Sequence, residues 1–162
     1  MKQLVIMRHA KAEKTAPSKE DFDRRLEHRG MEDAAQVARM LKSYGVKPDF
    51  ALVSAAARTQ GTFDQVKSVL GDIPALVSKD LYNADAGKLR QAIEMHEDDG
   101  ACLLVIAHNP GVQYLVADYL NEGAASLDDI ATVSRGYPTA AATVFTVDAA
   151  GRPIYDGLYV PE

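Results

Sequence analysis

Short apolar runs alternate with amphipathic stretches along most of the chain. A nearly continuous apolar run of a few residues is typical of a strand that is buried on both faces of a sheet. The runs that predict such strands are Gln3–Met7, Phe50–Val53, Ala75–Val77 and Cys102–Ala107. The last run is the most apolar of these, so we expect it near the centre of the sheet.

Apolar residues at helical spacing fill most of the intervals between these runs. The spacing predicts helices over Arg29–Tyr44, Ala57–Leu70, 86–95 and Pro110–Leu120. Asp85 is a candidate N-cap for the third of these helices, and Asn109 for the fourth, with Pro110 as its first helical residue. By contrast, Lys11–His28 is polar and contains Pro17, so we expect an ordered loop there.

The end of the chain carries two further strand patterns. Thr139–Val147 and Ile154–Tyr159 flank a turn at 148–151 and are expected to add an antiparallel edge. The alternation of strands and helices predicts an α/β fold with a largely parallel sheet covered on both faces. No linker marks a second unit, so we expect residues 1–162 to form a single domain.

Composition narrows the class of protein further. The 162 residues are 47% hydrophobic and 25% charged, which excludes a disordered chain. Cys102 is the only cysteine, which excludes a disulfide scaffold and a cysteine-based zinc site. The first apolar run meets Arg8 too early for a signal sequence, and no run approaches the ~20 apolar residues of a membrane span. We therefore expect a cytoplasmic protein with no membrane partner.

The charge balance bears on the partners of the protein. Lysine and arginine number 18 against 23 acidic residues, and the net charge is −5. An acidic chain of this kind is not expected to bind nucleic acid. Any anion site must therefore be a local concentration of cationic groups.

Such a concentration is predicted at one edge of the sheet. Arg8 and His9 follow the first strand directly, and His108 follows the 102–107 strand. Arg58 lies one turn beyond the second strand, at the start of a helix. Because the carboxyl ends of parallel strands share one edge, we expect these side chains to converge there, beside helix N-termini. This combination predicts a pocket for a small, highly charged anion such as phosphate.

The residue types suit phosphoryl transfer. Arginine is a planar fork that holds two phosphate oxygens and keeps its charge. A neutral histidine is a nucleophile towards phosphorus, and a second, protonated histidine stabilises the transferred group. This chemistry requires no metal and no cofactor.

Each of these residues alone also has a purely structural interpretation. Arg58 is then a solvated side chain or part of an ion pair, and His9 and His108 are hydrogen-bonded structural histidines. Only their conjunction at strand ends favours a functional site. His28 and His96 follow no buried strand and stay in the structural class.

Other active-site motifs are missing from the sequence. It contains no His-x-x-x-His zinc motif, no G-x-x-x-x-G-K-[ST] loop, no G-x-G-x-x-G after the first strand and no G-x-S-x-G elbow. Ser54 follows a strand, but it lacks an elbow motif and competes with His9, so we discount it as the nucleophile.

Several segments together resemble the histidine phosphatase superfamily, in particular its compact branch of SixA-type phosphohistidine phosphatases. The strongest pair is Arg8-His9-Ala10-Lys11-Ala12, similar to the Arg-His-Gly signature, with the distant His108-Asn109-Pro110-Gly111. The other matching segments, in family order, are 23–30, 54–62, 81–84 and 138–140. Together they span most of the chain.

The resemblance implies a phosphoglycerate mutase-like fold, a three-layer α/β/α sandwich with a mostly parallel central sheet. It also implies that His9 becomes phosphohistidine, that Arg8 and Arg58 hold the phosphoryl oxygens, and that His108 lies beside them. Alanine replaces a family residue at positions 10, 55 and 107, but these changes remove no charged partner.

The sequence does not match the family's general-acid motif. Asp85 lies in the right part of the chain, but we interpret it as a helix cap. An alkoxide needs a proton to leave, whereas imidazole, with a pKa of about 6.5, leaves more readily. A short chain also suggests an open site that admits a residue on another protein.

We therefore expect a metal-independent phosphatase acting on a phosphohistidine-bearing protein domain. The alternatives are a phosphatase of a small phosphate ester and a non-catalytic phosphoprotein-binding module. The module is less favoured because binding alone needs no nucleophile. The sequence does not predict the oligomeric state.

Overall fold

Six strands form one mixed sheet in the order β3-β2-β4-β1-β5-β6 in the computed structural model, which describes all residues from Met1 to Glu162. The strands are β1 (Gln3–Arg8), β2 (Phe50–Ser54), β3 (Ala75–Ser78), β4 (Cys102–Ala107), β5 (Ala142–Val147) and β6 (Pro153–Tyr159). Strands β3, β2, β4 and β1 run parallel, and β5 and β6 continue the sheet antiparallel. The predicted largely parallel sheet with an antiparallel edge is confirmed.

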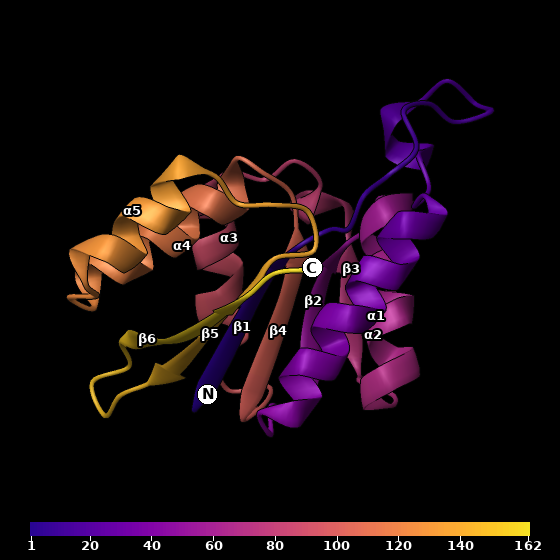
Figure 1. Cartoon of the computed structure of the whole chain (residues 1–162). Helices are drawn as coiled ribbons and strands as arrows, with labels where there is room; N and C mark the ends of the chain where they lie inside the picture. Colours follow the sequence, from indigo (N-terminus) through magenta and orange to yellow (C-terminus); the bar gives the residue numbers. More distant parts are fainter.

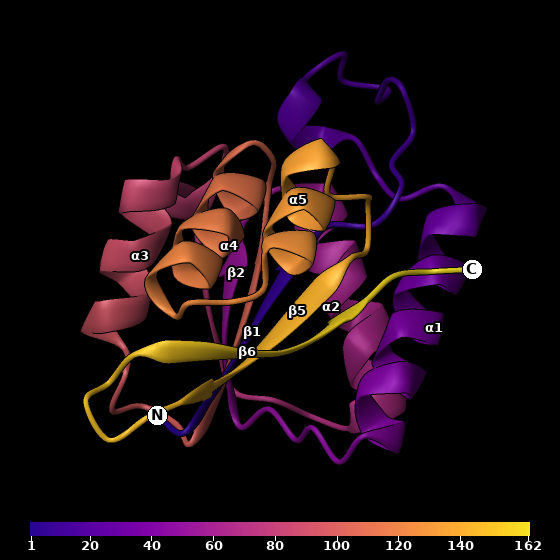
Figure 2. The same ribbon diagram turned by 60° about the vertical axis from the view of Figure 1, so that its left-hand side comes forward.

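Helices cover both faces of this sheet (Figure 1). The helices α1 (His28–Ser43) and α2 (Ala57–Leu70) pack on one face. The other face is covered by α3 (Ala86–Met95), α4 (Gly111–Glu122) and α5 (Leu127–Arg135). Figure 2 shows the same layers from the side of the second group. No helix in the chain is both long and apolar enough to cross a membrane.

The two faces of β1 and β4 explain why the sheet separates two hydrophobic cores. Successive residues of a strand point to opposite faces, so Val5 and Met7 of β1 pack towards α1 and α2, and Leu4 and Ile6 towards α3 and α4. Every residue of β4 is buried, as expected of a central strand. Burial of both faces makes these strands rigid supports for the residues that follow them.

Close backbone contacts require glycine at two helix starts. A Cβ at Gly111, the first residue of α4, would overlap the carbonyl oxygen of Ala84. A Cβ at Gly30, in the first turn of α1, would overlap the carbonyl oxygen of Lys11. These contacts bring the segments before α3 and after β1 against the ends of other helices, at the edge where the strands finish.

The structure differs from the predicted elements in several places, among them a short 3-10 helix, η2 (Lys79–Leu81), that follows β3. The loop after β1 contains a short 3-10 helix, η1 (Asp21–Asp23). Pro110 occupies the N-cap position of α4 and Gly111 is its first residue, one position later than expected, but Asn109 Oδ1 still accepts from the N–H of Gln113 at 3.3 Å. Helix α5 was not predicted; it is short, begins after the Ser126 cap and buries only Val133.

Candidate active site

The structure brings together the four residues predicted at the ends of the strands. Arg8 is the last residue of β1 and His9 follows it, Arg58 is the second residue of α2, and His108 follows β4 directly. Strands β1 and β4 are paired in register, with Arg8 opposite Ala107. The next residues along each strand are therefore neighbours, and the ring centroids of His9 and His108 lie 5.3 Å apart.

One ring nitrogen of His9 is occupied and the other has no hydrogen-bond partner. Its Nδ1 donates to the carbonyl oxygen of Ala10 at 2.7 Å. This contact places the proton on Nδ1 and leaves the lone pair of Nε2 free. The side chain is only 8% exposed, and this burial, with Arg58 and Arg8 nearby, lowers the pKa of His9 to about 4. The ring is therefore neutral near pH 7, as a nucleophile must be.

The backbone around His9 is fixed from three sides. The N–H of His9 donates to Ala107 at the end of β4, and its carbonyl accepts from the N–H of Ala140. The N–H of Ala10 donates to Thr62 Oγ1 at 2.9 Å, which joins this turn to α2. A nucleophile held in this way loses little orientational freedom when a substrate binds.

Each arginine has a buried Nε without a hydrogen-bond partner. Arg8 Nη1 donates to the carbonyl oxygen of Tyr137 at 2.9 Å. Arg58 Nη1 donates to the main-chain carbonyl of Asp21 at 2.9 Å, and its Nη2 to the Asp21 carboxylate at 3.0 Å. Because a buried N–H is costly when unpaired, the two free Nε–H groups are suited to an oxyanion.

The carboxylate of Asp21, which the sequence did not single out, joins several of these groups. Besides Arg58 it accepts from the Tyr82 hydroxyl and, at 2.9 Å, from Arg24 Nε. The hydrogen bond from Tyr82 and the two arginines lower the pKa of Asp21 to about 2. Asp21 is therefore ionised at neutral pH and cannot supply a proton to a leaving group.

His108 uses one ring nitrogen to contact Ser54, the last residue of β2. His108 Nε2 lies 2.7 Å from Ser54 Oγ, and His108 Nδ1 is buried without a partner. Burial, together with His9 and Arg58, lowers the pKa of His108 to about 3. Near pH 7 these shifts favour a neutral His108 rather than the protonated second histidine expected from the sequence, because the loss of water and the surrounding cations disfavour a charged ring.

Asp85 is placed as the sequence predicted. It is the N-cap of α3, and its Oδ1 accepts from the N–H of Lys88 at 2.8 Å. The cap interpretation of Asp85 is confirmed. No group of three or more His, Cys, Asp or Glu side chains comes together in an arrangement that could hold a metal ion.

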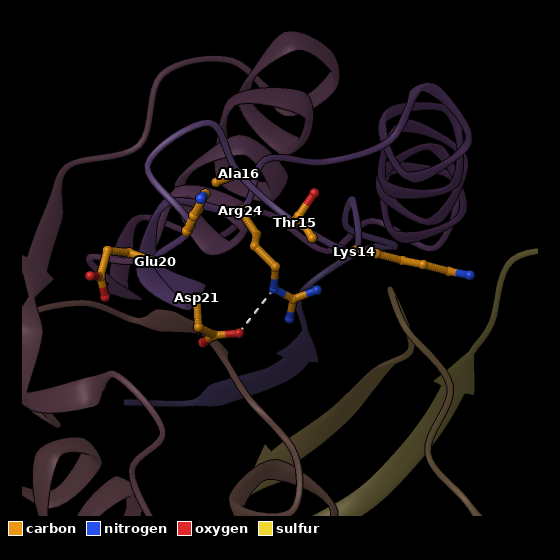
Figure 3. Close-up of a pocket in the computed structure, with 7 residues that line it drawn as sticks. Lys14, Thr15, Ala16, Glu20, Asp21 and Arg24 are labelled. Atoms are coloured by element: carbon orange, nitrogen blue, oxygen red, sulfur yellow. Dashed lines mark hydrogen bonds and ion pairs between the residues drawn. The ribbon is translucent and has the colours of Figure 1, made fainter.

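The site is less open than expected. His9, Arg58 and His108 are 8%, 3% and 2% exposed. The loop between β1 and α1 projects beyond the carboxyl end of the sheet (Figures 1 and 2), and its Asp21 contacts Arg58. Figure 3 shows a hollow that Asp21 lines, with Lys14, Glu20 and Arg24 among the other residues around it.

A comparison of the sequence with models of protein families identifies the family of this chain. The model of the histidine phosphatase superfamily (branch 1) matches residues 4–102, more than half of the chain. The chain therefore belongs to the histidine phosphatase superfamily, and it is a phosphatase.

Solved structures relate the chain to a compact group within that superfamily. The SixA protein of Agrobacterium tumefaciens is 25% identical with a TM-score of 0.86, over 99% of this chain and 98% of that one. A protein histidine phosphatase SixA complexed with tungstate is 27% identical with a TM-score of 0.79, over 98% and 97% of the two chains.

More distant structures share the fold. A phosphoglycerate mutase from Plasmodium falciparum is 16% identical with a TM-score of 0.65, over 99% of this chain and 92% of that one. The predicted phosphoglycerate mutase-like α/β fold is thus confirmed. A search of curated protein sequences gave no match.

Proposed function

We propose that this phosphatase removes the phosphoryl group from phosphohistidine on another protein, without a metal ion and through a phosphohistidine intermediate on His9. The observation that carries the proposal is the state of His9. Its ring is neutral near pH 7, its Nδ1 donates to Ala10, and its Nε2 lone pair is free beside two arginines.

In the first step, the Nε2 lone pair of His9 forms a bond to phosphorus. The substrate ring takes a proton from solvent on its second nitrogen, the bond from phosphorus to the leaving nitrogen breaks, and its electron pair stays on that nitrogen, so that neutral imidazole departs. The phosphorylated His9 ring carries a positive charge with its proton on Nδ1. The carbonyl oxygen of Ala10, already bonded to that nitrogen, stabilises this charge.

In the second step, water attacks the phosphorus of phospho-His9. The P–Nε2 bond breaks, the electron pair returns to Nε2 and phosphate leaves, while the proton lost by the attacking water goes to solvent. In both steps the attacking atom and the leaving nitrogen lie in line on opposite sides of phosphorus. His9 is thereby restored to its starting state.

Arg8 and Arg58 supply the positive charge that phosphoryl transfer requires. Charge spreads over the equatorial oxygens in the transition state, and fixed guanidinium groups in a water-poor site stabilise it. Both Nε–H groups are buried and unpaired in the free protein, so their hydrogen bonds to phosphoryl oxygens displace no protein partner. Two such cations provide the electrostatic stabilisation that a metal ion would otherwise give.

The acid–base properties of the site favour phosphohistidine as the substrate. Asp21 is the carboxylate that contacts Arg58, and with a pKa of about 2 it has no proton to give. An alkoxide leaving group needs a general acid that this site does not offer, whereas imidazole departs more readily without one. The likeness to a protein histidine phosphatase supports a substrate displayed on a protein.

The test compares His9→Ala with His28→Ala, a matched variant at an exposed histidine on α1. Purified proteins receive a phosphohistidine-bearing domain and a panel of small phosphate esters, all with EDTA and no added metal. We expect the unmodified protein and His28→Ala to turn over the phosphohistidine domain with the higher kcat/KM, and His9→Ala to lose about 10³-fold or more. Acid-labile label trapped on His9 in a short reaction identifies the intermediate.

Other results would contradict the proposal in distinct ways. Preference for a small ester would make the protein a phosphatase of small metabolites. Tungstate binding without any turnover would indicate a non-catalytic phosphoprotein-binding module. Loss of activity in EDTA that a divalent ion restores would contradict the metal-independent mechanism.

A further inference from the structure

Ser54 and His108 meet in a fully buried contact that the phosphatase mechanism above does not use. Ser54 is 0% exposed and ends β2, whereas His108 is 2% exposed and follows β4, the neighbouring strand. Their only side-chain hydrogen bond to each other joins Ser54 Oγ to His108 Nε2 at 2.7 Å. His108 Nδ1, in the same ring, is buried without a partner.

The other hydrogen bonds of the two side chains indicate whether Ser54 Oγ or His108 Nε2 is the donor. A serine hydroxyl has one proton to give and two lone pairs to offer. Ser54 Oγ also receives the backbone N–H of Ala56 at 3.4 Å, and the hydroxyl has no acceptor other than His108 Nε2. If Nε2 carried the proton, the buried hydroxyl proton of Ser54 and the lone pair of Nδ1 would both lack partners.

The opposite arrangement leaves fewer unsatisfied groups. When the Ser54 hydroxyl donates to Nε2, its proton is satisfied and the ring proton of neutral His108 resides on Nδ1. Only one group, the Nδ1–H of His108, then lacks a hydrogen-bond partner. A buried polar group without a partner costs free energy, so the arrangement with one such group is favoured over the arrangement with two.

We propose that Ser54 is a positioning residue that fixes neutral His108 in its Nδ1–H form, so that His108 donates a hydrogen bond to a phosphoryl oxygen without being protonated. This inference rests on the proposed function for the identity of the anion. The geometry supports it because Ser54 occupies Nε2 and leaves Nδ1 as the ring nitrogen available to a ligand beside His9.

The charges around His108 agree with a neutral donor. His9, Arg58 and Arg8 disfavour a positive ring, and only Asp21 among the nearby groups favours it. Burial of the ring has the largest effect and acts in the same direction as the cations. A neutral Nδ1–H keeps the hydrogen bond to phosphate and avoids adding a third positive charge beside the two arginines.

The decisive measurement is the tautomer of His108 in the whole protein. Histidine labelled with ¹⁵N, observed through long-range ¹H–¹⁵N correlations at pH 7, separates protonated from unprotonated ring nitrogens. A His108→Gln sample identifies the His108 signals by their loss. We expect Nδ1 protonated and Nε2 unprotonated. An Nε2–H form or a doubly protonated ring would overturn the proposal.

Tungstate serves as the anion in the second part of the experiment. Its addition is expected to move the His108 Nδ1 signal and leave the ring singly protonated. An unchanged Nδ1 signal in protein saturated with tungstate would overturn the donor role. This readout needs no turnover, so a failure of the proposed phosphohistidine activity does not affect it.

Variants of Ser54 test the positioning role. In Ser54→Ala we expect His108 to lose its single tautomer and tungstate affinity and kcat/KM to fall about tenfold. Ser54→Thr, which keeps the hydroxyl, should restore the Nδ1–H form. Ser78→Ala is the matched control, because Ser78 pairs with Ser54 in the β2–β3 register and makes no hydrogen bond to a histidine. An unchanged tautomer and affinity in folded Ser54→Ala would overturn the proposal.

Discussion

Arg58 and Asp21 form a two-point contact across 37 residues of sequence, in which one guanidinium donates to both the main-chain carbonyl and the carboxylate of the aspartate. The partners differ in environment: the Arg58 side chain is 4% exposed, whereas the Asp21 side chain is 49% exposed. Asp21 is therefore a counterion for a buried cation while remaining accessible to water. An incoming phosphate, which is also an anion, therefore binds beside a guanidinium group that is already paired with the Asp21 carboxylate.

The first prediction concerns the charge of Asp21. Asp21→Asn keeps the shape of the side chain but removes the negative charge from Arg58, so we expect tungstate and phosphate to bind more tightly, by about three- to tenfold. The free protein should lose about 1–2 kcal/mol of stability, less than for a fully buried ion pair, because Asp21 is half exposed. Calorimetric titration and thermal unfolding measure the two effects.

The matched control for this change is Asp23→Asn in the same 3-10 helix. Asp23 accepts from Ser18 and makes no hydrogen bond or ion pair with Arg58, so both quantities should stay unchanged. Weaker tungstate binding in Asp21→Asn would instead show that the carboxylate is needed to orient Arg58.

The second prediction concerns the shape of the cation at position 58. Arg58→Ala should weaken tungstate binding by the value of a charge-assisted hydrogen bond, about 1.5–3 kcal/mol. Arg58→Lys should recover only part of this loss, because lysine presents one ammonium group and cannot contact Asp21 and phosphate with separate N–H groups in one plane. Full recovery with lysine would indicate that charge alone matters at this position.

The third prediction concerns stability in mild acid. Burial lowers the pKa of His9 to about 4 and of His108 to about 3, whereas an unfolded histidine titrates near 6.5. Between about pH 6.5 and 4 the unfolded chain therefore binds protons that the folded chain does not. Stability should fall as the pH falls through this window, by up to ~1.4 kcal/mol per pH unit for each histidine.

Urea unfolding at pH 7 and pH 5 checks this expectation. His108→Gln should show a smaller loss between the two values than the unmodified protein, because one of the two buried histidines is absent. His28→Gln, at an exposed position on α1, should show the same loss as the unmodified protein. Equal losses in all three proteins would contradict the depressed pKa of His108.

The fourth prediction concerns the leaving group. With Asp21 ionised and Asp85 used as a cap, no carboxylic acid is in place to protonate a departing oxygen. Aryl phosphates and phosphohistidine should therefore react faster than alkyl phosphates by about 10²–10⁴-fold, the usual value of a general acid. A plot of rate against leaving-group pKa should be steep, and a flat plot would contradict this account.

Two variants of Asp85 separate its roles. Asp85→Asn should change neither the stability nor the ratio of rates, because asparagine is as good an N-cap as aspartate. Asp85→Ala should cost about 0.5–2 kcal/mol of stability without changing that ratio. Selective loss of alkyl phosphate hydrolysis in Asp85→Asn would make Asp85 the general acid.

The ends of the strands that carry the site could be predicted from the sequence, because each strand is a local run of apolar residues. Arg8, His9 and His108 each border a continuous apolar run, and parallel pairing brings the ends of such runs together. The convergence of these residues could therefore be predicted from the position of each strand and the parallel direction of the strands.

The rest of the site depends on contacts between distant segments. Asp21 lies in a polar stretch with no periodicity, and nothing local indicates that it reaches Arg58 and Tyr82. The one available signal was local: Asp21 lies three residues before Arg24, a spacing at which the two side chains can pair. Likewise, Ser54 ends a strand as expected, but its contact with His108 depends on the register of β2 against β4.

The carbonyl oxygen of Tyr137 has a consequence for the order in which the protein becomes active during synthesis. It accepts from both Arg8 and Asn109, and the N–H of Ala140 holds the carbonyl of His9. A nascent chain that ends before these residues already contains both arginines and both histidines, yet lacks these contacts and the strand β5 that pairs with β1. Phosphatase activity should therefore arise only after residues 137–147 have left the ribosome.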